Sequence, residues 1–155
     1  MARRSSPPER LLRLALWLCI GLAMVMPAAT AANGLLKPHL GCAVLLVVDG
    51  DTVKLLCPGE GIRRARLLGF DTPEIFSPAC LAEFARGIAA MAWLEGRLLA
   101  ARHYAVAAPE TGPASDRYGR RLVSLRIDGL DVAGDLTARG LARPYAGGRR
   151  EGWCA

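Results

Sequence analysis

The chain has 155 residues and a formal net charge of +6 at neutral pH. This length leaves room for one domain and excludes a multidomain organisation. Four of the 20 basic residues and one of the 14 acidic residues fall within the first 31 positions, so residues 32–155 carry 16 basic and 13 acidic residues, or +3. Such a mild positive balance suits a polyanionic partner but does not require one.

The first 31 residues have the pattern of a secretory signal peptide. Four arginines precede an apolar run from Leu14 to Met26, and Ala29-Thr30-Ala31 offers small residues for cleavage. The apolar run is short for a transmembrane span, so an uncleaved membrane anchor is the less favoured alternative. We expect a signal peptide at 1–31, a secreted or periplasmic domain at 32–155, and no stable membrane association after cleavage.

Four cysteines lie beyond the signal, namely Cys42, Cys57, Cys80 and Cys154. An even number of cysteines in an exported chain indicates disulfides, and their spacing gives no zinc pattern. If the chain folds back at residues 49–51, Cys42 and Cys57 lie nearly opposite each other across a hairpin. That would leave Cys80 to pair with Cys154. The alternative is four buried or free thiols.

Five short strands are predicted along the domain. Apolar residues fill 43–48 and 52–56, and the Asp-Gly pair between them predicts a hairpin. Alternating apolar residues and arginines over 62–70 predict a third strand. Residues 104–108 and 121–127 are predicted as the fourth and fifth strands.

Two helices are predicted among these strands. Ser77 followed by proline is typical of a helix start, and apolar residues then recur at three- and four-residue steps as far as Leu98. Gly87 and Gly96 weaken this helix, which suggests that something packs closely against it there. A shorter helix is predicted over 132–139, where a glycine ends it.

The order of these elements predicts the fold class. Five short strands, with one longer helix between the third and fourth and a short helix near the C-terminus, favour an α+β, mostly β, five-stranded OB-fold barrel. Residues 144–155 form a tail rich in glycine and arginine. Trp153 and a bridge from Cys80 to Cys154 would pin this tail to the domain.

Four acidic residues lie at the predicted ends of two strands. Asp49 and Asp51 flank the glycine of the first turn, and Asp71 and Glu74 flank Thr72-Pro73. Such a cluster repels itself, and calcium, which prefers several oxygen ligands, would remove that cost. Taken alone, an Asp-Gly-Asp sequence is simply a hairpin turn in most proteins.

Two arginines lie close to these acids in the predicted fold. Arg66 comes five residues before Asp71, and Arg120 begins another predicted strand. A planar guanidinium binds phosphate oxygens bidentately and stays charged while the transition state builds negative charge. Glu74 would then be free to orient or deprotonate an attacking water. Either arginine alone is more simply explained as a surface salt-bridge partner.

Together these blocks resemble the thermonuclease family, also described as staphylococcal or micrococcal nuclease-like. The matching stretches are Val48–Leu55, Arg66–Glu74, Asp116–Arg120 and Asp128–Ala142, in the family's order and approximate spacing. The resemblance covers about residues 43–145. It implies an OB-fold barrel that cleaves DNA and RNA with calcium as cofactor, leaving 3′-phosphate ends and preferring single strands.

The resemblance also implies a role for individual residues. The calcium ligands would be the carboxylates of two aspartates and one backbone carbonyl, from Asp51, Asp71 and Thr72 respectively. The catalytic residues would be a general base and two phosphate-stabilising arginines, namely Glu74, Arg66 and Arg120.

Three further positions would bind substrate. Arg117 and Tyr118 match residues that contact the terminal phosphate of the substrate. Tyr145 is roughly aligned with the base-stacking tyrosines of the family, although core packing explains it equally well. The long basic loop that follows the glutamate in the best-known member is missing here, because the predicted helix starts almost directly after Glu74. The groove that selects the substrate is therefore expected to be shortened.

Two rival functions are compatible with the same fold. One is a non-catalytic OB-fold module that binds nucleic acid or another polyanion, which fold alone does not exclude. The other is an envelope factor, for instance in exopolysaccharide production. Every catalytic position carries the required residue type, which favours the nuclease. No pattern indicates an oligomer, so a monomer is expected.

Overall fold

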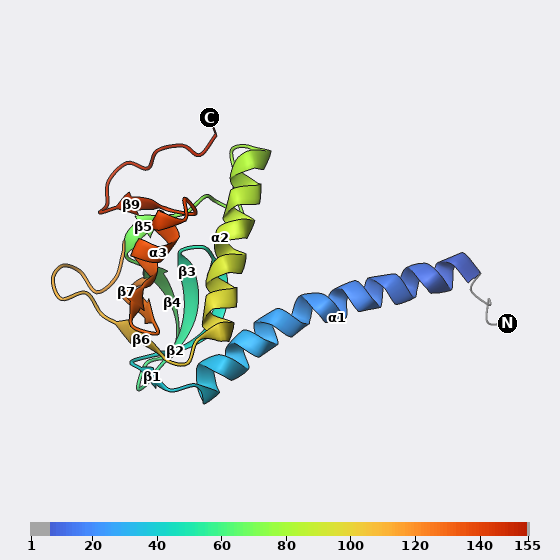
Figure 1. The fold of residues 1–155 in the computed structure, drawn as a ribbon, viewed down its shortest axis with the longest axis horizontal. Helices are drawn as coiled ribbons and strands as arrows, with labels where there is room; N and C mark the ends of the chain where they lie inside the picture. Colours follow the sequence, from blue (N-terminus) through green and yellow to red (C-terminus); the bar gives the residue numbers. More distant parts are fainter. Residues whose placement is uncertain (1–6, 155) are drawn as a thin grey trace.

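The computed structural model describes residues 7–154 as a mixed α+β structure that is mostly sheet (Figure 1). The elements follow in the order α1 (Pro7–Leu36), β1 (His39–Leu40), β2 (Ala43–Asp49), β3 (Thr52–Cys57), β4 (Gly61–Leu67), β5 (Gly69–Asp71), α2 (Leu81–Ala100), β6 (Tyr104–Ala107), β7 (Arg121–Ile127), β8 (Leu130–Asp131), α3 (Val132–Ala138) and β9 (Arg143–Tyr145). All five predicted strand regions and the short helix are therefore present.

The predicted count of five strands is wrong, because the described residues form nine. The predicted strand over 62–70 breaks at Leu68 into β4 and β5. The other additions, β1, β8 and β9, have two or three residues each. Strands this short are too brief to leave an alternating pattern in the sequence.

Most strands belong to one curled sheet. Its strands follow the order β1-β6-β7-β4-β3-β2, with β8 added beside β7, and β5 pairs separately with β9. The β3–β4 register sets Thr52 opposite Arg66, and the parallel β4–β7 register sets Arg66 opposite Leu122. The start of β7 and the end of β4 thus lie side by side.

The core fills the hollow of the sheet and is covered by α2. Its most completely buried side chains come from β2, β3, β4, β5, β7 and the two later helices, and include Val44, Val53, Leu55, Leu67, Phe70, Leu94, Leu125, Ile127 and Leu136. Burial of these apolar surfaces is the main driving force for the fold.

Helix α2 begins later than predicted. Its N-cap is Cys80, whose Sγ accepts from the backbone N–H of Glu83 at 3.4 Å, rather than Ser77. Glu83 also accepts from the backbone N–H of Ala79 at 2.7 Å. These bonds hold the preceding residues outside the helix, because the Glu83 carboxylate binds a backbone donor that lies before the N-cap.

The buried face of α2 also differs from a simple apolar stripe. Leu94 and Leu98 are buried as the periodicity predicts, whereas Leu81 is 81% exposed. In the first half of the helix the buried positions include Gly87 and Ala90. Small residues are buried there because other parts of the chain pack directly on the helix. The backbone of Pro73 lies against Gly87, and Gly50 lies against Ala90.

Helix α1 passes through the expected cleavage point and contacts the domain with its last turns. Thr30 is buried and its hydroxyl donates to Glu95 Oε1 of α2 at 2.8 Å. The hydroxyl of Tyr104 donates to the carbonyl of Gly34 at 2.8 Å. Earlier turns extend away from the domain (Figure 1). Within residues 7–154, no helix has both the length and the apolar character that crossing a membrane requires.

Both predicted disulfides are confirmed. Cys42 is bonded to Cys57 across the β2–β3 hairpin, and Cys80 is bonded to Cys154. The second bridge joins the start of α2 to the C-terminal tail. Disulfides of this kind are typical of proteins that fold in an oxidising compartment.

Candidate active site

The β2–β3 turn brings two acids against the start of the next segment. The backbone N–H of Asp51 donates to Asp49 Oδ1 at 3.1 Å, which fixes the turn. A β-carbon on Gly50 would lie 2.8 Å from Cγ2 of Thr72 and 2.8 Å from Cβ of Ala90. Glycine is therefore required at the centre of this turn, since a larger residue would separate the two acids from the Thr72 segment.

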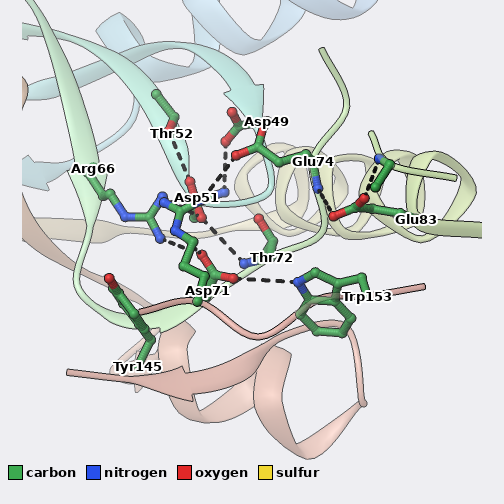
Figure 2. Close-up of polar contacts among 12 residues, drawn as sticks. Asp49, Asp51, Thr52, Arg66, Asp71, Thr72, Glu74, Glu83, Tyr145 and Trp153 are labelled. Atoms are coloured by element: carbon green, nitrogen blue, oxygen red, sulfur yellow. Dashed lines mark hydrogen bonds and ion pairs between the residues drawn. The ribbon is translucent and has the colours of Figure 1, made fainter. Parts of the chain in front are cut away.

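Arg66 joins two of the predicted metal ligands (Figure 2). Its Nη1 lies 2.7 Å from Asp51 Oδ2 and its Nη2 lies 2.9 Å from Asp71 Oδ1. All three side chains are buried. A guanidinium that pairs with two carboxylates away from water contributes strongly to local order, because removing it would leave both charges unpaired.

The carboxylate oxygens of these two aspartates face further donors. Thr52 Oγ1 donates to Asp51 Oδ1 at 3.0 Å, and the backbone N–H of Thr72 donates to Asp51 Oδ2 at 3.3 Å. Trp153 Nε1 lies 3.5 Å from Asp71 Oδ2. Thr52 and Trp153 had no predicted role at the acids, although each lies in a segment that the sequence analysis singled out.

Asp49 lies beside Asp51 in the cluster and has a raised pKa. Burial, followed by the charge of Asp51, raises the pKa of Asp49 to about 6 from an ordinary value of 3.8. Burial disfavours the charged carboxylate because it loses hydration, and the nearby negative charge of Asp51 adds to this effect. A bound cation would favour the charged form of both acids.

Glu74 projects from the segment that follows β5 and lines the same side of the site. A β-carbon on Gly87 would lie 2.8 Å from the Pro73 carbonyl oxygen, so this segment packs on α2. Half-buried Glu74 pairs with Arg150, whose Nη1 lies 3.0 Å from Glu74 Oε1. Nε of Arg150 lies 3.0 Å from Asp71 Oδ1.

The sequence analysis did not identify Arg150. The expected bridge from Cys80 to Cys154 could have indicated that Arg150 lies near the acids. That bridge returns the tail to the start of α2, a few residues beyond Glu74, and Arg150 lies only four positions before Cys154.

Arg120 is held beside the acids by Asp116. Nε and Nη2 of Arg120 lie 2.8 and 2.7 Å from Asp116 Oδ2, and the Arg120 backbone N–H donates to Oδ1 at 2.9 Å. Burial alone would raise the pKa of Asp116, but hydrogen bonds from Arg120 and Tyr118 outweigh it and lower the pKa below its ordinary value. Arg120 Nη1 lies 3.5 Å from Thr52 Oγ1, which links this arginine to the Asp51 side of the site.

The three predicted substrate-binding residues lie around Arg66 and Arg120. Arg117 Nη2 donates to the Tyr118 hydroxyl at 2.7 Å, and the Tyr118 ring, 68% exposed, lies 5.6 Å from the Arg120 guanidinium. The Tyr145 ring lies 5.9 Å from the Arg66 guanidinium. Tyr145 is half-buried on β9 beside the site rather than packed in the core.

One open groove of about 1830 Å³ connects these side chains. Its lining includes every predicted catalytic and substrate-binding residue, together with two further arginines of β4 and the tail arginine: Arg63, Arg64, Arg66, Glu74, Arg117, Tyr118, Arg120, Tyr145 and Arg150. The buried aspartates lie behind Arg66. The groove therefore combines guanidinium groups and aromatic rings with a largely apolar remainder from β4, β5 and the loops.

A second group of potential ligands lies at the start of α2. Cys80, Glu83 and Cys154 have ligand atoms within 4.8 Å of one another. The two sulfurs are bonded to each other, and metal binding requires thiolates, so this group could hold a metal only in its reduced form.

Chemically, the arrangement offers buried oxygen donors, a half-buried carboxylate and several guanidinium groups beside one groove. The predicted ligands Asp51 and Asp71 are brought together through Arg66, while Thr72 reaches Asp51 through its backbone N–H. No known protein-family model matches the chain.

Proposed function

We propose that this protein is a calcium-dependent nuclease that hydrolyses phosphodiester bonds of DNA and RNA, built on an OB-type barrel of the thermonuclease kind. The observation that carries the proposal is the position of Arg66. It pairs with buried Asp51 and Asp71 and lines the same groove as Glu74 and Arg120. Metal-assisted phosphodiester cleavage requires this combination of acids, base and phosphate-binding cations.

The residues present fit calcium. Carboxylates of Asp51 and Asp71, with the Thr72 carbonyl, would supply the oxygen donors that calcium prefers. Asp49 adds a further acid beside these ligands, and its pKa is raised first by burial and then by the charge of Asp51. When bound, calcium would add positive charge beside the scissile phosphate.

The chain's own residues would carry the remaining roles. Arg66 and Arg120, each fixed by buried or half-buried acids, would hold two phosphate oxygens and stabilise the charge that develops on them. Glu74 would accept a proton from the attacking water at the groove surface. Tyr145 would stack a base beside the scissile phosphate, and Arg117 with Tyr118 would bind a terminal phosphate.

The groove and the disulfides support the substrate class and the location. An open groove lined by arginines and tyrosines suits single-stranded nucleic acid, because exposed bases stack on aromatic rings while guanidiniums bind the backbone. The two disulfides support a secreted or periplasmic location. We propose that the protein works there as a monomer, without stable membrane association after signal cleavage.

A cleavage assay with the full chain tests the proposal. Single-stranded DNA is incubated with the protein and calcium, and in parallel with a chelator. Glu74→Gln and Arg120→Ala should each lower the calcium-dependent rate at least about a hundredfold. Arg121→Ala is the matched control and should cleave normally, because Arg121 pairs with Glu60 and does not line the groove. No calcium-dependent cleavage by the unmodified chain would defeat the proposal.

A non-catalytic module that binds nucleic acid is the second candidate. The pairing of Arg150 with both Asp71 and Glu74 favours it, since these contacts neutralise a metal ligand and the base. The same assay separates the two functions. Salt-sensitive binding of DNA without cleavage at any calcium concentration would identify the module rather than the enzyme.

A further inference from the structure

The C-terminal tail returns over the acidic cluster and is held at both ends. At one end, β9 pairs with β5, which sets Arg143 opposite Asp71. At the other end, Cys154 is bonded to Cys80, and the neighbouring Trp153 is only 6% exposed. The residues between these anchors form a loop that cannot move far from the site while the bridge is intact.

Trp153 is fixed by several contacts besides burial. The Arg143 guanidinium lies 3.8 Å from the centre of its ring, and Arg86 Nη1 donates to its carbonyl at 3.1 Å. Its indole N–H faces Asp71 (Figure 2). The tail is therefore held in place at Trp153 by several specific contacts.

Arg150 is the charged residue that this loop delivers to the acids. It pairs with Asp71 through Nε and with Glu74 through Nη1. Asp71 Oδ1 is consequently shared by Arg66 and Arg150. Arg150 lies at the edge of the groove, where its guanidinium is 5.9 Å from the centre of the Tyr145 ring, and its two ion pairs direct it toward the acidic cluster.

We propose that the tail is an autoinhibitory strap in which Arg150 acts as a tethered cation that competes with calcium for the acidic cluster. The inference rests on the proposed calcium-dependent function. Calcium on Asp71 and the seated Arg150 would place two positive groups against one carboxylate, and their repulsion disfavours simultaneous binding. The bridge between Cys80 and Cys154 strengthens the competition, because tethering keeps the effective concentration of Arg150 high.

The coupling is reciprocal. If seated Arg150 weakens calcium binding, calcium must weaken the seating of Arg150 by the same factor. Calcium would therefore open the strap as it fills the site.

Calorimetric titration of calcium into the full chain tests the strap. If about ten molecules have the strap closed for each one that has it open, the apparent affinity for calcium falls about tenfold. Arg150→Ala should therefore bind calcium about tenfold more tightly than the unmodified chain. The control is Arg149→Ala, which removes the same charge from the neighbouring exposed residue and should leave the affinity unchanged. Unchanged or weaker binding by Arg150→Ala, or no calcium binding by either protein, would overturn the inference.

A second variant tests the role of the Cys80–Cys154 bridge while keeping Arg150. Cys80→Ser with Cys154→Ser removes the bridge, and serine remains a good N-cap for α2. This variant should also bind calcium more tightly than the unmodified chain. If this variant and the unmodified chain bind calcium equally tightly, and circular dichroism shows an intact fold, the bridge does not hold Arg150 at the site and the strap as proposed is wrong.

Cleavage rates separate this inference from the proposed function. At limiting calcium, Arg150→Ala should cleave faster than the unmodified chain, and at saturating calcium the two should be equal. A raised KM at saturating calcium would instead identify Arg150 as a substrate phosphate ligand and overturn the strap. If no protein cleaves but calcium affinity rises in Arg150→Ala, the strap stands and the nuclease proposal fails.

Discussion

Gly87 of α2 lies directly beneath Pro73, so closely that an added β-carbon would be 2.8 Å from the Pro73 carbonyl oxygen. That contact positions the backbone of the segment carrying Glu74. Gly87→Ala should displace this segment and lower the proposed nuclease rate more than tenfold, because about 1 Å of misplacement can cost a hundredfold in rate. Steady-state cleavage of single-stranded DNA is the measurement.

Gly96 provides the control on the same helix. A β-carbon there would meet nothing within 4 Å. Gly96→Ala should leave the rate unchanged and stabilise the protein by about 0.5–1 kcal/mol, since alanine favours a helix interior. Equal rates for the two variants would show that packing at Gly87 does not position Glu74.

The second prediction concerns the stability of the acidic cluster. Arg66→Ala should lower the free energy of unfolding by about 3–5 kcal/mol, because it leaves the buried Asp51 and Asp71 without their shared partner. Urea unfolding without metal measures the change. Arg64→Ala, on the exposed part of the same strand, should change stability by less than about 0.5 kcal/mol. Similar losses in both variants would contradict the buried pairing.

The third prediction follows from the raised pKa of Asp49. The folded chain holds this proton up to about pH 6, whereas an ordinary aspartate, with a pKa of 3.8, releases it earlier. The folded state therefore binds more protons than the unfolded state between those values, and this residue's contribution to stability falls as pH rises from about 4 to 6. Asp49→Asn should remove that fall, because asparagine can still accept from the Asp51 N–H.

Urea unfolding in metal-free buffer at several pH values between 4 and 7 checks this prediction. Other acids titrate in the same range, so the quantity to compare is the difference between the variant and the unmodified chain. That difference should grow in favour of Asp49→Asn up to about pH 6 and then level off. A constant difference across the range would refute the assignment to Asp49.

The fourth prediction concerns the junction of α1 with the domain. Thr30→Val should destabilise the full chain by about 1–3 kcal/mol, because it leaves buried Glu95 without the Thr30 hydroxyl as donor. Thermal or urea unfolding measures the loss, with Thr111→Val in an exposed loop as the neutral control. An unchanged midpoint in Thr30→Val would mean that this contact does not contribute to the stability of the domain.

Several features of the site could be predicted because their signals are local. The hairpin at residues 49–51 follows from an Asp-Gly pair between two apolar runs, and that hairpin in turn predicts the bridge between Cys42 and Cys57. Asp71 and Glu74 could be placed at a strand end because a proline between them stops strand pairing. These inferences need only a few neighbouring residues.

Other features depend on segments far apart in the chain. β5 and β9 pair although they lie more than seventy positions apart in the chain. Each strand has three residues, which are too few to give a recognisable strand pattern in the sequence. The start of α2 was predicted too early, because the carboxylate of Glu83 holds the residues before Cys80 outside the helix. Neither outcome has a signal in local periodicity.

The amino-acid sequence by itself determined the main strand regions, the short third helix, both disulfides and the acids and arginines placed at strand ends. Each follows from short-range pattern or from pairing of a small number of cysteines. Only the tertiary structure decided that Arg66 bridges Asp51 and Asp71, and that Arg150 returns to Asp71 and Glu74. The physical reason is that ion pairs depend on which side chains meet in space, and these partners come from the β2–β3 turn, β4, β5, the segment after β5 and the tail.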